Sequence, residues 1–134
     1  MRALLLLTCL ALPSWANSPE QVMNDLLRAL KTNDASNAGI REVFEQAAPE
    51  NKAMTGPLPR FISMVSQHPY GELVNHQSAV IGQPDMQADQ ATFPIRLISK
   101  EGRAMGYVWT LQQQPDDQWM TTSVYPVAVG GQGL

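Results

Sequence analysis

Apolar and polar residues alternate at helical spacing in a first segment that begins at Ser18 and ends near residues 31–34. Ser18, Pro19 and Gln21 form a helix start signal, because a serine N-cap, a proline at the first position and a glutamine at the third complete a capping box. One face of the segment is apolar and consists of Val22, Met23, Leu26, Leu27 and Leu30. The spacing predicts an amphipathic helix with this face buried in the core.

A second helical pattern begins between Asp34 and Asn37 and runs to about Ala47. Its apolar stripe consists of Ile40, Val43, Phe44 and Ala47. We expect Pro49 to end this helix, because the ring of a proline excludes the preceding residue from the helical region. The polar residues 50–52 that follow are interpreted as a solvated turn.

A third helix is predicted to start within the stretch "GPLPRF". With Gly56 as the N-cap, Pro57 and Pro59 fall in the first turn, where no backbone N–H has an intrahelical partner to lose. The next apolar residues follow helical spacing at Leu58, Phe61, Ile62 and Val65. This short helix should end before Pro69, so the chain opens with three helices.

Beyond Gly71 the period of the pattern changes to alternation. The segment 72–82 is interpreted as a first strand that is closed by a turn at residues 82–85. In residues 88–99, every second side chain is apolar, which indicates a strand with one buried face. Because Pro94 cannot donate to a ladder, we expect an edge or a bulge there.

Two further strands follow, at residues 104–114 and 118–127. Turns at residues 100–103 and 115–117 join them into a meander, and Gly102 takes the turn position that needs a positive φ. The predicted fold class is therefore α+β, with three N-terminal helices on a four-stranded antiparallel sheet.

Residues 1–16 have the pattern of a cleaved secretory signal: one cation, an apolar run too short to span a bilayer, and small residues before the cut. Cleavage between Ala16 and Asn17 leaves 118 residues, 134 minus 16, without cysteine. We therefore expect a periplasmic or secreted bacterial protein with no stable membrane anchor. Residues 17–127 are interpreted as a single domain, and residues 128–134 as a flexible glycine-rich tail.

The amino-acid composition argues against several classes of partner and site. Its net charge is −3, and it has no basic run, which argues against nucleic acid as a partner. The spacing of Met64 and His68, with His76 further on, would suit a soft copper ion, but no second ligand cluster accompanies them. The acidic residues fall in polar contexts, so we single out no catalytic residue and expect no metal or cofactor.

Three motifs carry a resemblance to a known family. The stretch "AAPENKAMTGPLPRF", the segment "HPYGELVNH" and the ending "GRAMGYVWTLQQQPDDQWMTTSVYPV" resemble a family of small exported bacterial proteins that is known only as a domain of unknown function. The resemblance covers residues 19–127 and implies the nuclear transport factor 2-like, or cystatin-like, cone fold, in which helices pack into a strongly curved antiparallel sheet. That group contains isomerases, dehydratases and binding modules, so the resemblance implies no particular activity.

The aromatic residues have two interpretations. Phe61, Phe93, Tyr107 and Trp109 either form the core between helices and sheet, or they line an apolar ligand pocket of the cone. In the second interpretation, the Tyr107 hydroxyl and Arg96 are the polar contacts. The sequence favours a binding or accessory module for a small apolar ligand. An isomerase or dehydratase-like enzyme and a structural homodimer formed through the sheet face are the alternatives.

Overall fold

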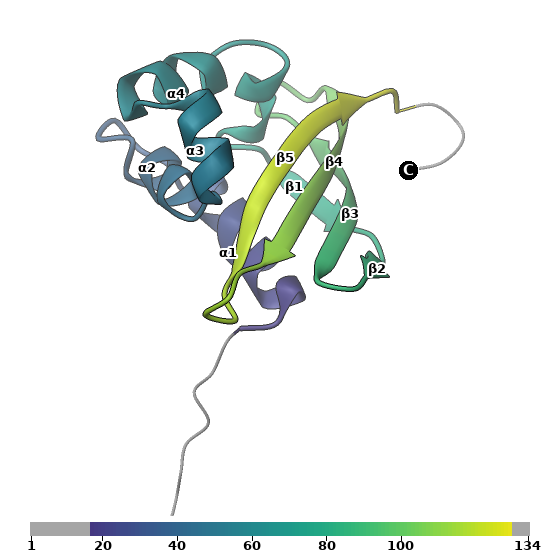
Figure 1. The fold of residues 1–134 in the computed structure, drawn as a ribbon. Coiled ribbons are helices and arrows are strands. Elements are labelled where there is room, and N and C mark those ends of the chain that lie inside the picture. Colours follow the sequence, from purple (N-terminus) through teal and green to yellow (C-terminus); the bar gives the residue numbers. More distant parts are fainter. Residues whose placement is uncertain (1–16, 130–134) are drawn as a thin grey trace, which may run out of the picture.

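The computed structural model describes residues 17–129, so the predicted leader, residues 1–16, and residues 130–134 of the predicted tail lie outside the described residues. None of the helices in this range is long and apolar enough to cross a membrane. Residues 17–129 form four α-helices, one 3-10 helix and five strands, which Figure 1 labels where there is room. They are α1 (Pro19–Lys31), α2 (Ala38–Glu45), α3 (Pro49–Thr55), α4 (Leu58–Val65), η1 (Tyr70–Leu73), β1 (Ser78–Ile81), β2 (Asp85–Gln87), β3 (Gln90–Ile98), β4 (Ala104–Gln113) and β5 (Trp119–Val127).

The α+β class is confirmed, but the prediction of three helices and four strands is wrong, because the structure has a fourth helix and a fifth strand. The first helix agrees with its start signal. The Ser18 hydroxyl accepts a hydrogen bond from the Gln21 backbone N–H at 3.2 Å, and the Gln21 side chain accepts one from the Ser18 backbone N–H at 3.0 Å. Both bonds of the capping box therefore form, and they fix where α1 begins.

The additional helix is α3, which occupies the segment interpreted as a solvated turn. Pro49 does not end the second helix, since α2 already ends at Glu45 and Pro49 opens α3. A proline suits that first position because its missing N–H would have no partner there. Gly56 is the C-cap of α3 and Pro57 is the N-cap of α4. A Cβ on Gly56 would lie 2.8 Å from the Lys52 carbonyl oxygen, so the close approach at this junction requires glycine.

The predicted first strand is correct only in its second half. Residues 70–73 form the 3-10 helix η1, and Asn75 has a φ of 57°, so regular pairing starts only at Ser78. The additional strand, β2, is three residues long and exposed at every position, and it therefore lacks the alternation that would have revealed it. The remaining strands form the predicted meander, with Gly102 at a φ of +91° in the hairpin between β3 and β4.

Pro94 lies where the sheet tolerates it. The sheet order is β1-β3-β4-β5, and β2 pairs with β3 beyond the end of β1. The carbonyl oxygen of Pro94 accepts a hydrogen bond from the Gly82 backbone N–H at 2.8 Å, so this residue faces the interruption between β1 and β2. Since the N–H and C=O of one residue face the same side of an antiparallel strand, the proline ring removes only the reciprocal bond to Gly82, at the end of β1, and none of the bonds to β4.

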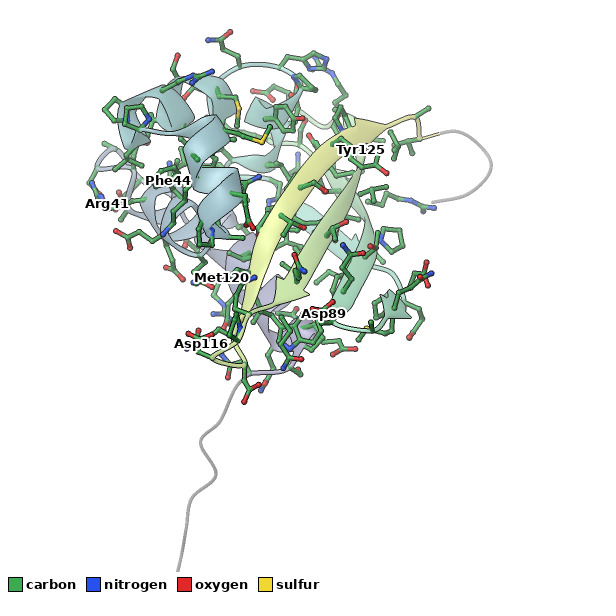
Figure 2. All side chains as sticks on the ribbon, in the orientation of Figure 1. Arg41, Phe44, Asp89, Asp116, Met120 and Tyr125 are labelled. Atoms are coloured by element: carbon green, nitrogen blue, oxygen red, sulfur yellow. The ribbon has the colours of Figure 1, made fainter. Side chains whose placement is uncertain are left out.

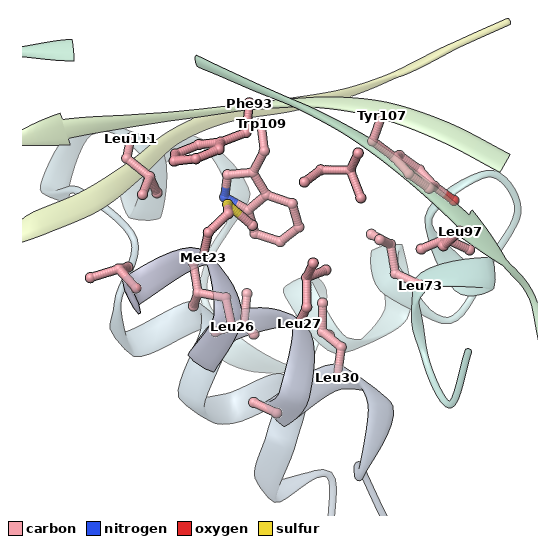
Figure 3. Packing of buried hydrophobic residues seen from close by; sticks show 14 of the residues in the cluster. Met23, Leu26, Leu27, Leu30, Leu73, Phe93, Leu97, Tyr107, Trp109 and Leu111 are labelled. Atoms are coloured by element: carbon pink, nitrogen blue, oxygen red, sulfur yellow. The ribbon is translucent and has the colours of Figure 1, made fainter. Parts of the chain in front are cut away.

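The core lies between α1 and the inner face of the sheet. Figure 3 shows Met23, Leu26, Leu27 and Leu30 of α1 directed toward the aromatic side chains of β3 and β4. Phe93, Tyr107 and Trp109 are at most 1% exposed. Burial of each such apolar side chain contributes roughly 1.5–3 kcal/mol, which makes this contact the main source of stability.

A β-bulge in β5 connects the sheet to the helices. Thr110 pairs with Ser123 and Leu111 with Thr121, so Thr122 is an extra residue on β5. The backbone of Thr121 donates to the Gln46 carbonyl oxygen at 3.2 Å and accepts from the Ala48 N–H at 2.8 Å. The connection between α2 and α3 is thereby attached to the sheet at one point.

Candidate functional site

An apolar cavity lies beside this attachment, between the helical layer and the strands β4 and β5. Its volume is about 130 Å³, and it is partly open to solvent. Side chains from α1, α2, α4, η1 and β4 form most of its wall, among them Leu30, Val43, Phe61, Val65, Leu73 and Trp109. All six of these residues are buried, whereas four others, Asn51, Thr55, Met64 and Tyr70, are half-buried and so partly accessible to solvent.

Four polar side chains reach the cavity, those of Asn51, Thr55, Tyr70 and Thr121. The Thr55 hydroxyl donates to the Asn51 carbonyl oxygen at 2.9 Å, and the Tyr70 hydroxyl donates to the Val124 carbonyl oxygen at 3.1 Å. The Asn51 amide donates to the Thr122 carbonyl oxygen at 3.0 Å, which docks α3 on the bulge.

The fourth polar residue, Thr121, is the only one of the four that is classed as buried. Thr121 is 4% exposed, and its hydroxyl oxygen accepts a hydrogen bond from the Trp109 indole N–H at 2.9 Å. No lining residue carries a carboxylate, an imidazole, an amine or a guanidinium group. The cavity is therefore a neutral, mainly apolar site in which hydroxyl and amide groups are the only polar contacts.

The structure separates the residues that the sequence placed in one pocket. Phe61 and Trp109 line the cavity, and whether they contact a ligand stays a prediction. Phe93 and Tyr107 are packed in the core, where the Tyr107 hydroxyl donates to the Pro69 carbonyl oxygen at 2.6 Å. Arg96 is exposed on the opposite face of the sheet and is not a contact of this cavity, because it lies between the inward-facing positions of β3.

Sequence reasoning missed Asn51, Tyr70 and Thr121. Asn51 belonged to the polar patch that no helix start signal explained, and it is this patch that forms α3. Tyr70 was assigned to no element, and Thr121 was assigned only to a regular strand. The sequence hint for Thr121 is the pair of adjacent threonines in β5. The β-bulge that turns the first of them toward the inner face cannot be recognised from the sequence, because no particular residue type marks it.

A cluster of three charged or ionisable side chains, Glu72, His68 and Arg103, holds η1 in place. The Glu72 side chain, 8% exposed, accepts hydrogen bonds from the His68 imidazole at 2.9 Å and from the Arg103 guanidinium, while its other oxygen has no partner among residues 17–129. Burial acts to raise the pKa of Glu72, but the hydrogen bond and charge of His68 and the charge of Arg103 outweigh it, so the pKa is lowered. The carboxylate is thereby kept ionised near η1.

Two other buried groups titrate away from their ordinary values. Burial lowers the pKa of His76, whose ring donates to the Leu73 carbonyl oxygen at 2.8 Å. Burial, together with the charge of Glu72, raises the pKa of Tyr107. In the described part of the chain, no group of three or more histidine, cysteine or acidic residues could hold a metal ion. Met64 lines the cavity while His68 is paired with Glu72, so the two side chains have separate roles.

The family model described as "Domain of unknown function (DUF4864)" matches residues 16–133. The chain belongs to the DUF4864 family. No curated protein matches the sequence of this DUF4864 chain.

Solved structures show which fold the DUF4864 chain has. It is similar to a protein from Campylobacter jejuni described as an NTF2-like transpeptidase, with a TM-score of 0.53, 12% identity, and coverage of 78% of this chain and 97% of that chain. It is also similar to a protein from Parabacteroides distasonis described as a ketosteroid isomerase, with a TM-score of 0.53 and 15% identity. This match covers 86% of the DUF4864 chain and 90% of the other protein. A third similar structure is a cyanobacterial iota-carbonic anhydrase complexed with bicarbonate, with a TM-score of 0.50 and 13% identity. This match covers 92% of the DUF4864 chain and 100% of the carbonic anhydrase chain. At these identities the likeness shows the fold alone, which is NTF2-like.

The Glu72 cluster leads to a test of stability against pH. Because the pKa of Glu72 is lower in the folded than in the unfolded chain, its contribution to the free energy of unfolding is present above the unfolded pKa, near 4.5, and is lost as the pH falls through the folded pKa. We expect Glu72→Gln to cost about 1–2 kcal/mol at pH 7 and much less at pH 3. Urea denaturation across this range measures the difference.

The matched control is Glu45→Gln, which removes an exposed acid from α2 and should follow the wild-type curve. A Glu72→Gln deficit that stays the same from pH 7 to pH 3 would show that the carboxylate does not act through its ionisation.

Proposed function

We propose that this DUF4864 protein is a binding module that holds a small neutral apolar ligand in the cavity between its helices and strands β4 and β5. The observation that carries the proposal is the composition of the wall, which is apolar, free of charged groups, and open at one side. An apolar wall favours an apolar occupant because burial of both surfaces releases water. The few hydroxyl and amide groups orient the occupant without demanding a charge on it.

The volume limits the size of the ligand. Pockets for drug-sized molecules measure roughly 300–1,000 Å³, whereas an apolar cavity of roughly 150 Å³ binds benzene. The cavity of this protein, about 130 Å³, therefore fits one ring or a short branched alkyl group. A sterol or a full acyl chain would have to leave most of its surface outside.

The enzymatic alternative, an isomerase or dehydratase-like activity, has less support. Such reactions need an acid or base within hydrogen-bond reach of the reacting atoms. The ionised carboxylate of Glu72 is held by His68 and Arg103 and is not among the lining residues. The lining therefore favours binding over proton transfer in this cavity.

A filled cavity provides the direct test. We expect toluene to shift the methyl NMR signals of lining residues such as Leu73 in the wild-type protein, in a saturable way. Ala47 is 3% exposed and lines the cavity, so Ala47→Leu should occupy the space and abolish the shifts.

The control is Ala53→Leu, the same substitution at an exposed position of α3 outside the lining, which should leave toluene binding unchanged. Equal binding by wild type and Ala47→Leu would place the toluene elsewhere and contradict the proposal.

We also propose that the protein acts outside the cytoplasm, on the strength of the pattern in residues 1–16. Expression of the full chain in a bacterium, followed by cell fractionation and N-terminal sequencing of the product, tests this location. We expect a periplasmic or secreted product that begins at Asn17. A cytoplasmic product that still carries residues 1–16 would overturn it.

A second candidate role, a structural homodimer through the sheet, rests on the outer face. Figure 1 shows no helix of the described range in front of this face, and Figure 2 shows Tyr125 on it. Val80 is 65% exposed and Tyr125 50% exposed. Arg96 and Asp85 also lie on this face, since Asp85 pairs with Thr92, which is adjacent to the inward-facing Phe93. A two-fold pair of such faces could match each arginine with the aspartate of the other copy.

A charge reversal tests this dimer. By sedimentation equilibrium we expect the wild-type protein to dimerise, Arg96→Asp to weaken the dimer by about tenfold or more, and the double change Asp85→Arg with Arg96→Asp to restore it. A wild-type protein that stays monomeric at high concentration would remove the candidate.

A further inference from the structure

We infer that the ligand of the cavity carries a hydrogen-bond acceptor, such as a ketone oxygen, which receives the hydroxyl proton of Thr121. The inference rests on the proposed function and deepens it by naming the ligand class. That class is the neutral cyclic or branched compounds with one ring's volume and one carbonyl or ether oxygen.

The hydrogen bond from Trp109 decides which part of the Thr121 hydroxyl is free. A hydroxyl group has one proton and two acceptor lone pairs, whereas an indole N–H can only donate. The 2.9 Å bond from Trp109 therefore occupies a lone pair and leaves the Thr121 proton uncommitted. Among the hydrogen bonds of residues 17–129, none takes that proton.

The backbone of Thr121 is held in place on both sides of the residue. Its N–H donates to Gln46 and its carbonyl accepts from Ala48, so both backbone groups are fixed to the helical layer. Thr121 as a whole is 4% exposed and is one of the residues that line the cavity. A buried donor without an acceptor is unfavourable, and the cavity is the side from which an acceptor could reach it.

The other polar groups of the wall do not compete for this role. The hydroxyl protons of Thr55 and Tyr70 are already donated to backbone carbonyl oxygens. Asn51 is half-buried, so water can reach its side chain. Thr121 is thus the buried donor that selects, among ring-sized ligands, those that carry a hydrogen-bond acceptor.

The absence of charge in the wall fixes the rest of the ligand class. A carboxylate or an ammonium group placed against this lining would be desolvated without a counter-charge, which is strongly unfavourable. A neutral oxygen can accept the Thr121 proton at a much lower cost. The occupant is therefore a neutral ketone-like or ether-like molecule instead of an acid or an amine.

Two ligands of equal shape separate this inference from the proposed function. Cyclohexanone and methylenecyclohexane have the same ring, and only the first has an acceptor at the exocyclic atom. Their dissociation constants are measured by methyl NMR titration with wild type, Thr121→Val and the control Thr121→Ser, which keeps the hydroxyl. We expect the wild-type preference for the ketone, relative to the alkene, to fall by about three- to tenfold in Thr121→Val and to persist in Thr121→Ser.

Each outcome decides one of the two claims. If neither compound binds to the wild-type cavity, the proposed function fails. If both bind and Thr121→Val leaves the preference unchanged, the proposed function stands and the inference is wrong. Should Thr121→Val not fold, a crystal structure of the wild-type protein with cyclohexanone decides instead. We expect the ketone oxygen about 3 Å from the Thr121 hydroxyl oxygen, and an oxygen directed elsewhere would overturn the inference.

Discussion

The attachment of the α2–α3 connection to Thr121 is the interaction on which the rest of the structure depends. Two backbone hydrogen bonds, from Thr121 to Gln46 and from Ala48 to Thr121, hold the helical layer to β5. They are available because β5 is the edge strand of the sheet, where backbone groups that do not pair with β4 are free to bond to the helical layer. The bulge places Thr121 opposite Leu111, on the inner face. It also frees the Thr122 carbonyl oxygen to accept from Asn51, which anchors α3. Since the layers are joined by backbone groups, side chains need not fill the space beside the joint, and the cavity lies there.

The same joint explains how polar and apolar chemistry are separated in this fold. On the inside, Thr121 and Trp109 give the cavity one fixed polar point in an apolar wall. On the outside, the ion pairs of Glu72 with His68 and Arg103 hold η1, whose Tyr70 and Leu73 face the cavity. These charged side chains therefore help to position the cavity wall, although none of them lines the cavity. This arrangement suits selective binding of a neutral molecule, whereas proton transfer would need an ionisable group inside.

Much of the fold could be predicted where the signal was periodic. The α1 stripe and its capping box, and the alternation along β3 and β4, each depend on local geometry that residue types report directly. The elements that were missed depend on tertiary contacts: α3 has no buried residue, and β2 is exposed at every position, so neither shows a pattern. The candidate site was predicted only in part, because alternation assigns Trp109 to the inner face but cannot distinguish a cavity wall from packed core. The inward turn of Thr121 results from a bulge, which is a relation between two strands and not a property of either one.

The proposed binding requires an accessible apolar cavity beside Thr121. Diffraction from crystals pressurised with xenon tests it most directly, because xenon enters apolar cavities of this size and is located without reference to any ligand chemistry. We expect a xenon atom between Phe61, Leu73 and Trp109. A crystal in which these side chains close on one another, with no xenon between them, would contradict the claim.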